Sequence, residues 1–282
     1  MEIKLQRDLF FNALQSLQGV VETKATSMPI LQNVLIETLG GKKNISVSGT
    51  NLDISLKGNI DAEVMKAGKL TLNARKLFDI IRELSPGGIV TLVAEENQRV
   101  KIEGGNAKFS LPSLPYSDFP SMPDKAETKP HKIPAKKLSE MIKRTMFAIS
   151  QDETRYTYNG VFMESENQIL RLVATDGHRL AKIELLYSDG LANIPGVIIP
   201  KKTINELSKL LSDSSGNIKI NLDPNKIIFY IDKTILISKL IDGNFPDYQR
   251  VIPSENNDVL VVNRAQFCQA VDRVSTITSE KS

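Results

Sequence analysis

The segment LQNVLIETLGGKKNISVSGTNLDISLK, residues 31–57, has a second copy in the chain, YNGVFMESENQILRLVATDGHRLAKIE, residues 158–184. In both copies, short runs of alternating apolar and polar residues are separated by turn residues, a pattern typical of antiparallel strands. The two copies are offset by about 127 residues. An internal repeat of this length predicts a fold in which one domain occurs more than once.

Helical patterns follow the same repeat. GKLTLNARKLFDIIREL (68–84) matches PGVIIPKKTINELSKLL (195–211), and each predicts a short strand that runs into an amphipathic helix. A further helix is predicted at the start of each unit, because apolar residues recur there at i, i+3, i+4 and i+7. These helices are QRDLFFNALQSL (6–17), AKKLSEMIKRTMFAI (135–149) and NRAQFCQAVDRVSTI (263–277), so the third copy stops after one helix.

Proline-rich segments end the first two units. SLPYSDFPSMP (113–123) and IDGNFPDYQRVIP (241–253) carry boundary signals, because proline cannot continue a helix or a strand ladder. Before them, residues 91–111 and 217–240 alternate apolar and polar residues at hairpin spacing. We therefore predict an α+β fold of pseudo-symmetric repeats, each with two amphipathic helices against antiparallel sheets. The predicted domains are 1–127, 128–253 and an incomplete third domain, 254–282.

Composition excludes several classes of protein. The chain has 282 residues, of which 41% are hydrophobic and 24% charged, as expected of a folded globular protein. No apolar run reaches the roughly 20 residues that span a bilayer, and MEIKLQRDLF is not a signal peptide, so we expect a cytoplasmic protein without membrane contact. One cysteine, Cys268, and two distant histidines, His131 and His178, exclude a disulfide framework and predict no metal and no cofactor.

Basic side chains recur at matching helix positions. Arg75 and Arg82 are seven residues apart and therefore share a helix face, and Lys202 and Lys209 repeat that spacing in the second unit. The first helix of the second unit adds Lys143 and Arg144. One basic helix face is ordinarily just solvated, but repetition in register predicts a surface that contacts DNA phosphates without reading bases.

Several motifs resemble those of the bacterial beta sliding clamp family, the processivity subunit of DNA polymerase III. They are MPILQNVLIE (28–37), TRYTYNGVFME (154–164), VATDGHRLA (173–181), DGNFPDYQRVIP (242–253) and the closing TSEKS. The resemblance implies three copies of one domain per chain, and two chains that close head to tail into a homodimeric ring around duplex DNA. Helices would line the hole and sheets would form the outside.

The resemblance also implies a pocket for short peptides that contain glutamine and leucine. The replicative polymerase alpha subunit, the clamp loader and repair polymerases would dock there. Leu180, Pro246 and Val251 would form an apolar floor, with directed polar groups around it. The implied pocket residues are Tyr158, Thr175, Gly177, His178, Arg179, Leu180, Pro246, Arg250 and Val251.

Further DNA contacts and the subunit interface are implied in the same way. The DNA-contacting loops would contain Lys24 and the segment 151–156, including Gln151, Arg155 and Tyr156. Lys24 lies one residue further from Pro29 than the family's arginine. The subunit interface would join the edge that carries Phe109 and Leu111 to the helix that carries Ile277. Since the third copy stops early, we expect ring closure and one wall of the peptide pocket to need more than these 282 residues. The most informative observation is whether the native reading frame continues after Ser282.

Other functions lack the motifs that they need. PGGIV (86–90) is no phosphate-binding loop, and the carboxylates are scattered, so no catalytic residues are predicted. Asp176-Gly177 indicates a hairpin turn rather than a catalytic cluster. A helix-turn-helix regulator needs adjacent helices, whereas these are separated by strand patterns. A two-domain clamp that trimerises would also yield six units, but the extra third helix would lie on the edge that such an interface requires.

Overall fold

The computed structural model describes residues 1–24, 26–41, 43–122, 130–187, 193–253 and 258–278. It confirms the α+β class, with helices against antiparallel sheets. The chain divides into two compact units, Met1–Phe245 and Pro246–Ser282, and each is considered by itself. The predicted boundary after residue 127 falls within 123–129, and the predicted boundary after residue 253 borders 254–257. Both segments lie outside the described residues, so the two boundaries stay predictions. Most of TSEKS lies outside them as well.

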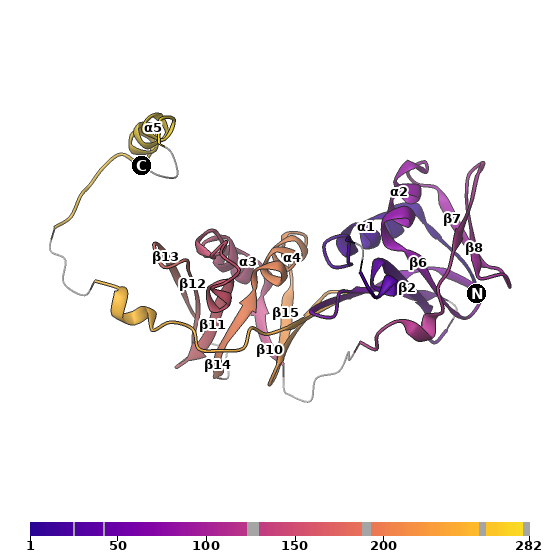
Figure 1. Ribbon diagram of the computed structural model, residues 1–282, viewed down its shortest axis with the longest axis horizontal. Helices are drawn as coiled ribbons and strands as arrows, with labels where there is room; N and C mark the ends of the chain where they lie inside the picture. Colours follow the sequence, from indigo (N-terminus) through magenta and orange to yellow (C-terminus); the bar gives the residue numbers. More distant parts are fainter. Residues whose placement is uncertain (25, 42, 123–129, 188–192, 254–257, 279–282) are drawn as a thin grey trace. The chain divides into compact units, whose positions relative to one another are not determined.

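The first unit contains both repeats, and in each the predicted order of helix, strands, helix and strands is preceded by one further strand (Figure 1). The first repeat consists of β1 (Glu2–Gln6), α1 (Arg7–Leu17), β2 (Asn33–Thr38), β3 (Asn44–Thr50), β4 (Ile54–Asp61), β5 (Glu63–Lys66), β6 (Lys69–Asn73), α2 (Ala74–Glu83), β7 (Ile89–Ala94), β8 (Arg99–Gly104) and β9 (Ala107–Pro112). The second consists of β10 (His131–Pro134), α3 (Ala135–Lys143), β11 (Gly160–Glu166), β12 (Ile169–Thr175), β13 (Leu180–Leu186), β14 (Ile194–Pro200), α4 (Lys201–Ser212), β15 (Asn217–Asp223), β16 (Lys226–Ile231) and β17 (Thr234–Lys239).

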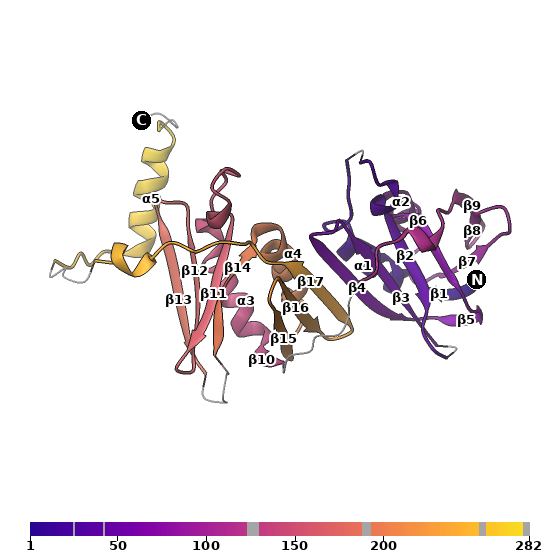
Figure 2. The same ribbon diagram turned by 60° about the horizontal axis from the view of Figure 1, so that its bottom comes forward.

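Among the described residues, the strands form three sheets, and the strand order within them shows how the repeats join. The orders are β5-β1-β7-β8-β9, β13-β12-β11-β14 and, running through both repeats, β10-β15-β16-β17-β4-β3-β2-β6 (Figure 2). In the last of these, β17 of the second repeat pairs antiparallel with β4 of the first. The two repeats therefore share one continuous sheet.

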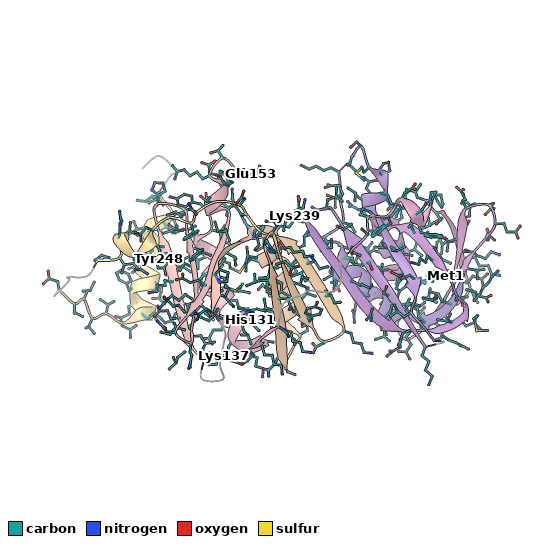
Figure 3. All side chains as sticks on the ribbon, turned by 90° about the horizontal axis from the view of Figure 1, so that it is seen from below. Met1, His131, Lys137, Glu153, Lys239 and Tyr248 are labelled. Atoms are coloured by element: carbon teal, nitrogen blue, oxygen red, sulfur yellow. The ribbon has the colours of Figure 1, made fainter. Side chains whose placement is uncertain are left out.

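Ion pairs flank this junction at both ends. Lys233 Nζ lies 3.1 Å from Asp61 Oδ1, and Lys239 Nζ lies 3.1 Å from Asp53 Oδ1 (Lys239 is labelled in Figure 3). All four side chains are largely exposed, so these pairs specify register more than they add stability. Backbone hydrogen bonds between β17 and β4 carry the connection.

In each repeat both helices cover the same side of the strands (Figure 1). The apolar faces that the sequence predicted are buried, with Phe10 and Leu14 of α1 and Leu77 and Ile81 of α2 fully enclosed. Each such side chain contributes about 1.5–3 kcal/mol through burial. The opposite helix faces remain exposed, and they carry the predicted basic residues.

Two helix ends differ from the sequence prediction. The helix predicted for 135–149 ends at Lys143, and a separate 3-10 turn, Met146–Ala148, follows. The Thr145 hydroxyl donates to the Met141 carbonyl at 2.9 Å, and such back-bonding competes with helix continuation. In the second unit α5 (Arg264–Ser275) ends before Ile277, so the prediction that Ile277 lies on that helix is wrong.

Candidate functional site

The connection between β12 and β13 is a tight turn held by its own side chains. The Thr175 hydroxyl donates to the Arg179 carbonyl at 2.7 Å and accepts from the Gly177 amide at 3.1 Å. Asp176 Oδ1 accepts from the amides of His178 and Arg179, both at 3.0 Å. Gly177 has φ +91°, and a Cβ there would lie 3.1 Å from a guanidinium nitrogen of Arg155, so this position favours glycine. The carboxylate therefore builds the turn, as the Asp-Gly pattern predicted.

The turn presents its remaining side chains to solvent. Arg179 donates from Nε to Asp176 Oδ2 at 3.0 Å, and its guanidinium lies 5.8 Å from the centre of the Phe147 ring. His178 is exposed and Leu180, the first residue of β13, is half-buried. A rigid backbone thus carries an imidazole, a guanidinium and an apolar side chain, which suits recognition of an extended ligand.

The hydrogen bonds of the turn lower the pKa of Asp176 to about 2. The amide of His178 is the largest cause, followed by the amide of Arg179, with a smaller contribution from the Arg179 side chain. Because the folded pKa lies below the ordinary value of 3.8, the carboxylate stabilises the folded state above that value. The contribution is lost as the pH falls through about 2.

We therefore expect a pH-dependent effect of Asp176→Asn. The melting temperature of the wild type should exceed that of the variant near neutral pH, and the difference should shrink between about pH 4 and pH 2. Thermal unfolding of both proteins across this range measures it, and the other carboxyl groups cancel because they titrate in both. A difference that does not change with pH would show that the charge of Asp176 does not hold the turn.

The first repeat contains the same turn between β3 and β4. The Thr50 hydroxyl donates to the Ile54 carbonyl at 3.1 Å and accepts from the Leu52 amide at 3.0 Å. Asn51 Oδ1 accepts from the amides of Asp53 and Ile54 at 3.2 and 3.0 Å. Leu52 takes the place of Gly177 at φ +77°, a conformation that is costly for a branched side chain. The turn is therefore structurally duplicated although its side chains differ.

The correspondence of the turns corrects the offset read from the sequence. The bonds of Thr50 match those of Thr175, an offset of 125, whereas the second helices of the repeats, α2 and α4, keep an offset of 127. The connection between β2 and β3 is longer than the connection between β11 and β12, and this difference in length accounts for the change of offset. The predicted Thr-containing hairpin is confirmed in both copies, and only the second copy presents Gly-His-Arg.

The predicted DNA-contacting segment of the second repeat lies against this turn. Arg155 Nη1 donates to the Asp176 carbonyl at 3.5 Å. Tyr156 is 60% exposed, whereas Tyr158, at the end of the 3-10 turn Tyr156–Tyr158, is half-buried. Gln151 accepts a hydrogen bond from Lys201 at the start of α4. Arg155 thus links the segment predicted to contact DNA to the turn predicted to contact peptides.

Sequence reasoning missed Phe147. It assigned this residue to a continuous helix, but the 3-10 turn leaves the ring 56% exposed beside Arg179. An exposed aromatic ring next to a guanidinium offers a flat apolar contact for a ligand. No local signal distinguishes it in the sequence, because Phe147 fits the helical pattern.

Three predicted pocket residues belong to the second unit. Pro246 precedes the 3-10 turn Tyr248–Val251, which contains Arg250 and Val251. Arg250 Nε lies 2.7 Å from Asp247 Oδ2. These residues are described within their own unit, and their contribution to a pocket with the turn at Asp176 stays a prediction.

The predicted DNA-facing cations lie on the exposed faces of three helices. Helix α2 packs on α1 and α3 packs on α4. A hollow of about 540 Å³ separates α1 from α4, with Gln15 on one side and Lys209 on the other. These contacts place the helices in the order α2-α1-α4-α3. A continuous basic surface across both repeats would require this order. Its exposed cations are Arg75, Arg82, Lys143, Arg144, Lys202 and Lys209.

Lys24 lies in the connection between α1 and the 3-10 turn Pro29–Gln32. Its side chain is exposed, and its carbonyl accepts from Gln32 Nε2 at 2.8 Å. The Lys24 amide donates to Glu22 Oε1 at 3.1 Å and is the largest cause of the lowered pKa of Glu22. Lys202 of the second repeat also lowers the pKa of Glu22. Lys24 and Lys202, both predicted to contact DNA, therefore both lie close enough to Glu22 to affect its pKa.

The predicted subunit-interface residues of the first repeat lie on an edge strand. Phe109 and Leu111 belong to β9, which ends the five-stranded sheet of the described residues. Phe109 is 37% exposed, and Leu111 packs partly against the core. An edge strand offers unpaired backbone groups to another strand, as an interface between sheets needs. Ile277, in the second unit, is 85% exposed.

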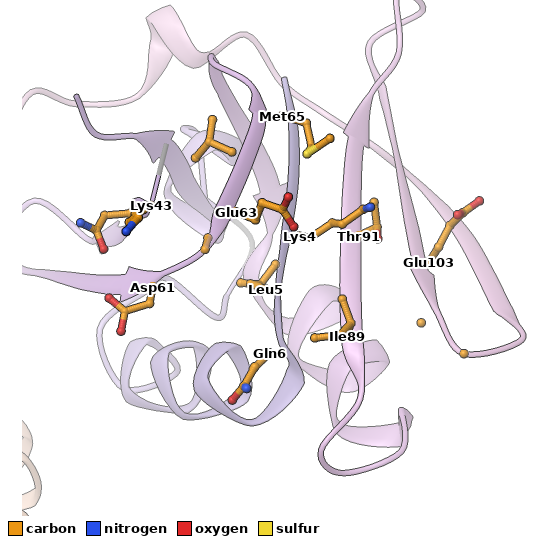
Figure 4. A pocket seen from close by; sticks show the side chains of 15 residues that line it. Lys4, Leu5, Gln6, Lys43, Asp61, Glu63, Met65, Ile89, Thr91 and Glu103 are labelled. Atoms are coloured by element: carbon orange, nitrogen blue, oxygen red, sulfur yellow. The ribbon is translucent and has the colours of Figure 1, made fainter. Parts of the chain in front are cut away.

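A hollow of about 1380 Å³ lies over the outer face of the five-stranded sheet (Figure 4). Lys4, Glu63, Thr91 and Glu103 line it, together with the exposed side chains of Met65 and Ile89. Its charges are mixed and its walls are open.

Within the described ranges, no group of His, Cys, Asp and Glu side chains could hold a metal ion. Among the same residues, no helix combines the length and the apolar character that crossing a membrane requires.

Family models match both repeats. The N-terminal domain of the DNA polymerase III beta subunit matches residues 1–123, and its central domain matches residues 132–247. Among curated relatives, the beta sliding clamp of Caulobacter vibrioides is 39% identical over the whole chain, and that of Escherichia coli K12 is 32% identical. In both comparisons the chain spans 76% of the relative's length.

Solved structures agree with this result. A sliding clamp from Bartonella birtlesii, bound to griselimycin, has a TM-score of 0.93 and 40% sequence identity. The DNA polymerase III subunit beta from Pseudomonas aeruginosa has a TM-score of 0.92 and 35% identity. Each comparison covers 100% of this chain and 76% of the other.

Proposed function

This chain belongs to the bacterial beta sliding clamp family, and on that premise we propose that it encircles duplex DNA and tethers the replicative polymerase to it. Its relatives are non-catalytic processivity factors of a DNA-directed DNA polymerase, and this chain has the same role in DNA replication. Any transferase activity then belongs to the holoenzyme. We propose a cytoplasmic homodimer with clamp domains at 1–127 and 128–253 and the first helix of an incomplete third domain at 254–282.

The pairing of β17 with β4 is the observation that carries this proposal. By repeat equivalence, β9 of the first repeat corresponds to β17, and β13 of the second corresponds to β4. Both end their sheets among the described residues, so each can pair with a further clamp domain by the same edge-to-edge contact. Repeating one contact between equivalent domains generates a closed ring when the rotation between neighbours closes, as we propose for this family's fold. Phe109 and Leu111 would lie in such a contact.

The helices would face the DNA in this ring. Their exposed cations supply charge without a pattern of donors and acceptors for base edges, so binding would be independent of sequence and sensitive to salt. Lys24, Gln151, Arg155 and Tyr156 would extend this contact from the connecting loops. Such weak, exchangeable phosphate contacts permit sliding.

Partners would dock at the turn that carries His178 and Arg179. The polymerase alpha subunit, the clamp loader and repair polymerases would each insert a short segment that contains glutamine and leucine. Tyr158 and Leu180 would contribute apolar surface, with Pro246, Arg250 and Val251 completing the pocket. Tethering raises the effective concentration of the polymerase at the primer end, so a modest peptide affinity suffices and partners can exchange.

A primer-extension assay tests the proposal. The protein, at the length made by its own cells, is added with a clamp loader to the replicative polymerase on a primed circular template. We expect products several times longer per binding event, because the tethered polymerase rebinds the same primer end. A linear template with free ends serves as the control, since a ring slides off it. Equal product lengths with and without the protein would reject the proposal.

A further inference from the structure

Three of the predicted DNA-facing cations, on or at the end of a helix, are each paired with an acid of that helix. Arg82 Nη1 lies 3.2 Å from Asp79 Oδ1, and its Nε also lies 3.1 Å from Glu83 Oε1. Lys209 Nζ lies 2.8 Å from Glu206 Oε1. Arg144 Nη2 lies 2.6 Å from Glu140 Oε1. All three acids precede their cation by three or four residues, the spacing at which helical side chains meet.

The pairing is repeated between the two copies of the second helix. Asp79 and Glu206 are separated by the same 127 residues that separate Arg82 from Lys209. Both members of the pair therefore recur together on α2 and α4. A surface selected only for attraction to phosphates would gain by leaving these cations without acids.

Glu206 is held in place more firmly than a surface acid. Its side chain is 9% exposed, and it lies where a Cβ on Gly19, just past the end of α1, would overlap the carboxylate. The acid is therefore fixed at the junction between the two repeats, and it holds the Lys209 ammonium from there. Asp79 and Glu140 are about half exposed and act from the helix surface.

A phosphate that binds one of these cations must compete with a carboxylate about 3 Å away. The acid also repels the phosphate directly, and both effects reduce the free energy gained per contact. We propose that Asp79, Glu140 and Glu206 are positioning residues that weaken the hold of the helical wall on DNA, so that the ring slides. This inference rests on the proposed function, in which these helices face DNA.

The test compares two triple variants with equal changes in charge. The first, Asp79→Asn, Glu140→Gln and Glu206→Gln, neutralises the wall acids while conserving their shapes. The second, Glu37→Gln, Glu103→Gln and Asp223→Asn, neutralises three acids of the sheets, each also within 3.5 Å of a lysine. Affinity for a short duplex is measured by fluorescence anisotropy over a salt series, and sliding is measured by single-molecule tracking of clamps loaded on DNA.

We expect the first variant to bind duplex about three- to tenfold more tightly, because three helical ion pairs are removed while Arg82 keeps its pair with Glu83. Its salt dependence should steepen by up to about 0.9 per released cation, and its diffusion along DNA should slow. The sheet variant should change little. Thermal unfolding checks both variants, and the double variant Asp79→Asn, Glu140→Gln repeats the test if burial makes Glu206→Gln unstable.

Equal tightening in both triple variants would reject the inference, because net charge alone would then explain the effect. Unchanged affinity and diffusion in the first variant would also reject it. Reversing Arg82 and Lys209 to glutamate separates this failure from failure of the proposed function. If that reversal weakens DNA binding while the neutralised acids have no effect, the DNA-facing wall stands and only the role of the acids is wrong.

Discussion

Replacing His178 and Leu180 together by alanine should lower the affinity for a polymerase-derived peptide at least about 30-fold, the effect of losing one strong interface contact. The turn itself should survive, because its hydrogen bonds come from Thr175, Asp176 and backbone groups rather than from the two replaced side chains. The change therefore removes recognition groups from an intact backbone. Titration of a fluorescent peptide containing glutamine and leucine measures the loss.

The duplicated turn provides a matched control. Leu52→Ala alters an exposed residue of the equivalent turn in the first repeat, where the same pattern of backbone bonds occurs. Peptide affinity should not change in this variant. If the variant His178→Ala, Leu180→Ala binds the peptide with unaltered affinity, the peptide pocket does not lie at this turn. Equal losses of affinity in both variants would indicate a general effect on the fold.

Local patterns were sufficient to predict most elements of both repeats, although the strands β1 and β10 that precede the first helices were not predicted. The alternating strands, the amphipathic helices and the Asp-Gly turn each depend on neighbours in sequence, and the structure confirms them. The end of α3 was not predictable, because the Thr145 hydroxyl competes with the helix while the apolar pattern continues to residue 149. Leu52 at φ +77° was likewise unexpected, since leucine gives no signal for a left-handed turn.

Long-range pairing was beyond the reach of the sequence. The contact of β17 with β4 joins residues about 180 apart, and nothing in either strand alone distinguishes an internal pairing from an exposed edge. The acids that pair with Arg82 and Lys209 were visible at helical spacing, yet only the structure shows that Glu206 is buried against Gly19. Sequence therefore predicted which residues could form the candidate sites, and the structure shows how they are held.

Reversing Arg82 and Lys209 to glutamate should weaken duplex DNA binding by roughly 10- to 100-fold at low salt, because two phosphate contacts are lost and two repulsions are added. The salt dependence of binding should fall by about 2 for the same reason. Stimulation of DNA synthesis should drop in parallel, whereas peptide affinity should stay unchanged, because the turn at Asp176 lies on other elements. Anisotropy with duplex and with peptide measures both properties on one sample.

Lys69→Glu with Lys226→Glu is the appropriate control for this reversal. These lysines lie on sheet strands away from the proposed subunit contact, and each is within 3.5 Å of a carboxylate, so the control matches both the charge change and the loss of ion pairs. If the helices face DNA, only the first variant should lose affinity strongly, because screening limits the reach of the sheet charges to about 10 Å. Equal losses would mean that net charge attracts DNA to the whole protein, and an unchanged rate of synthesis in Arg82→Glu, Lys209→Glu would reject the helical wall as the DNA-facing surface.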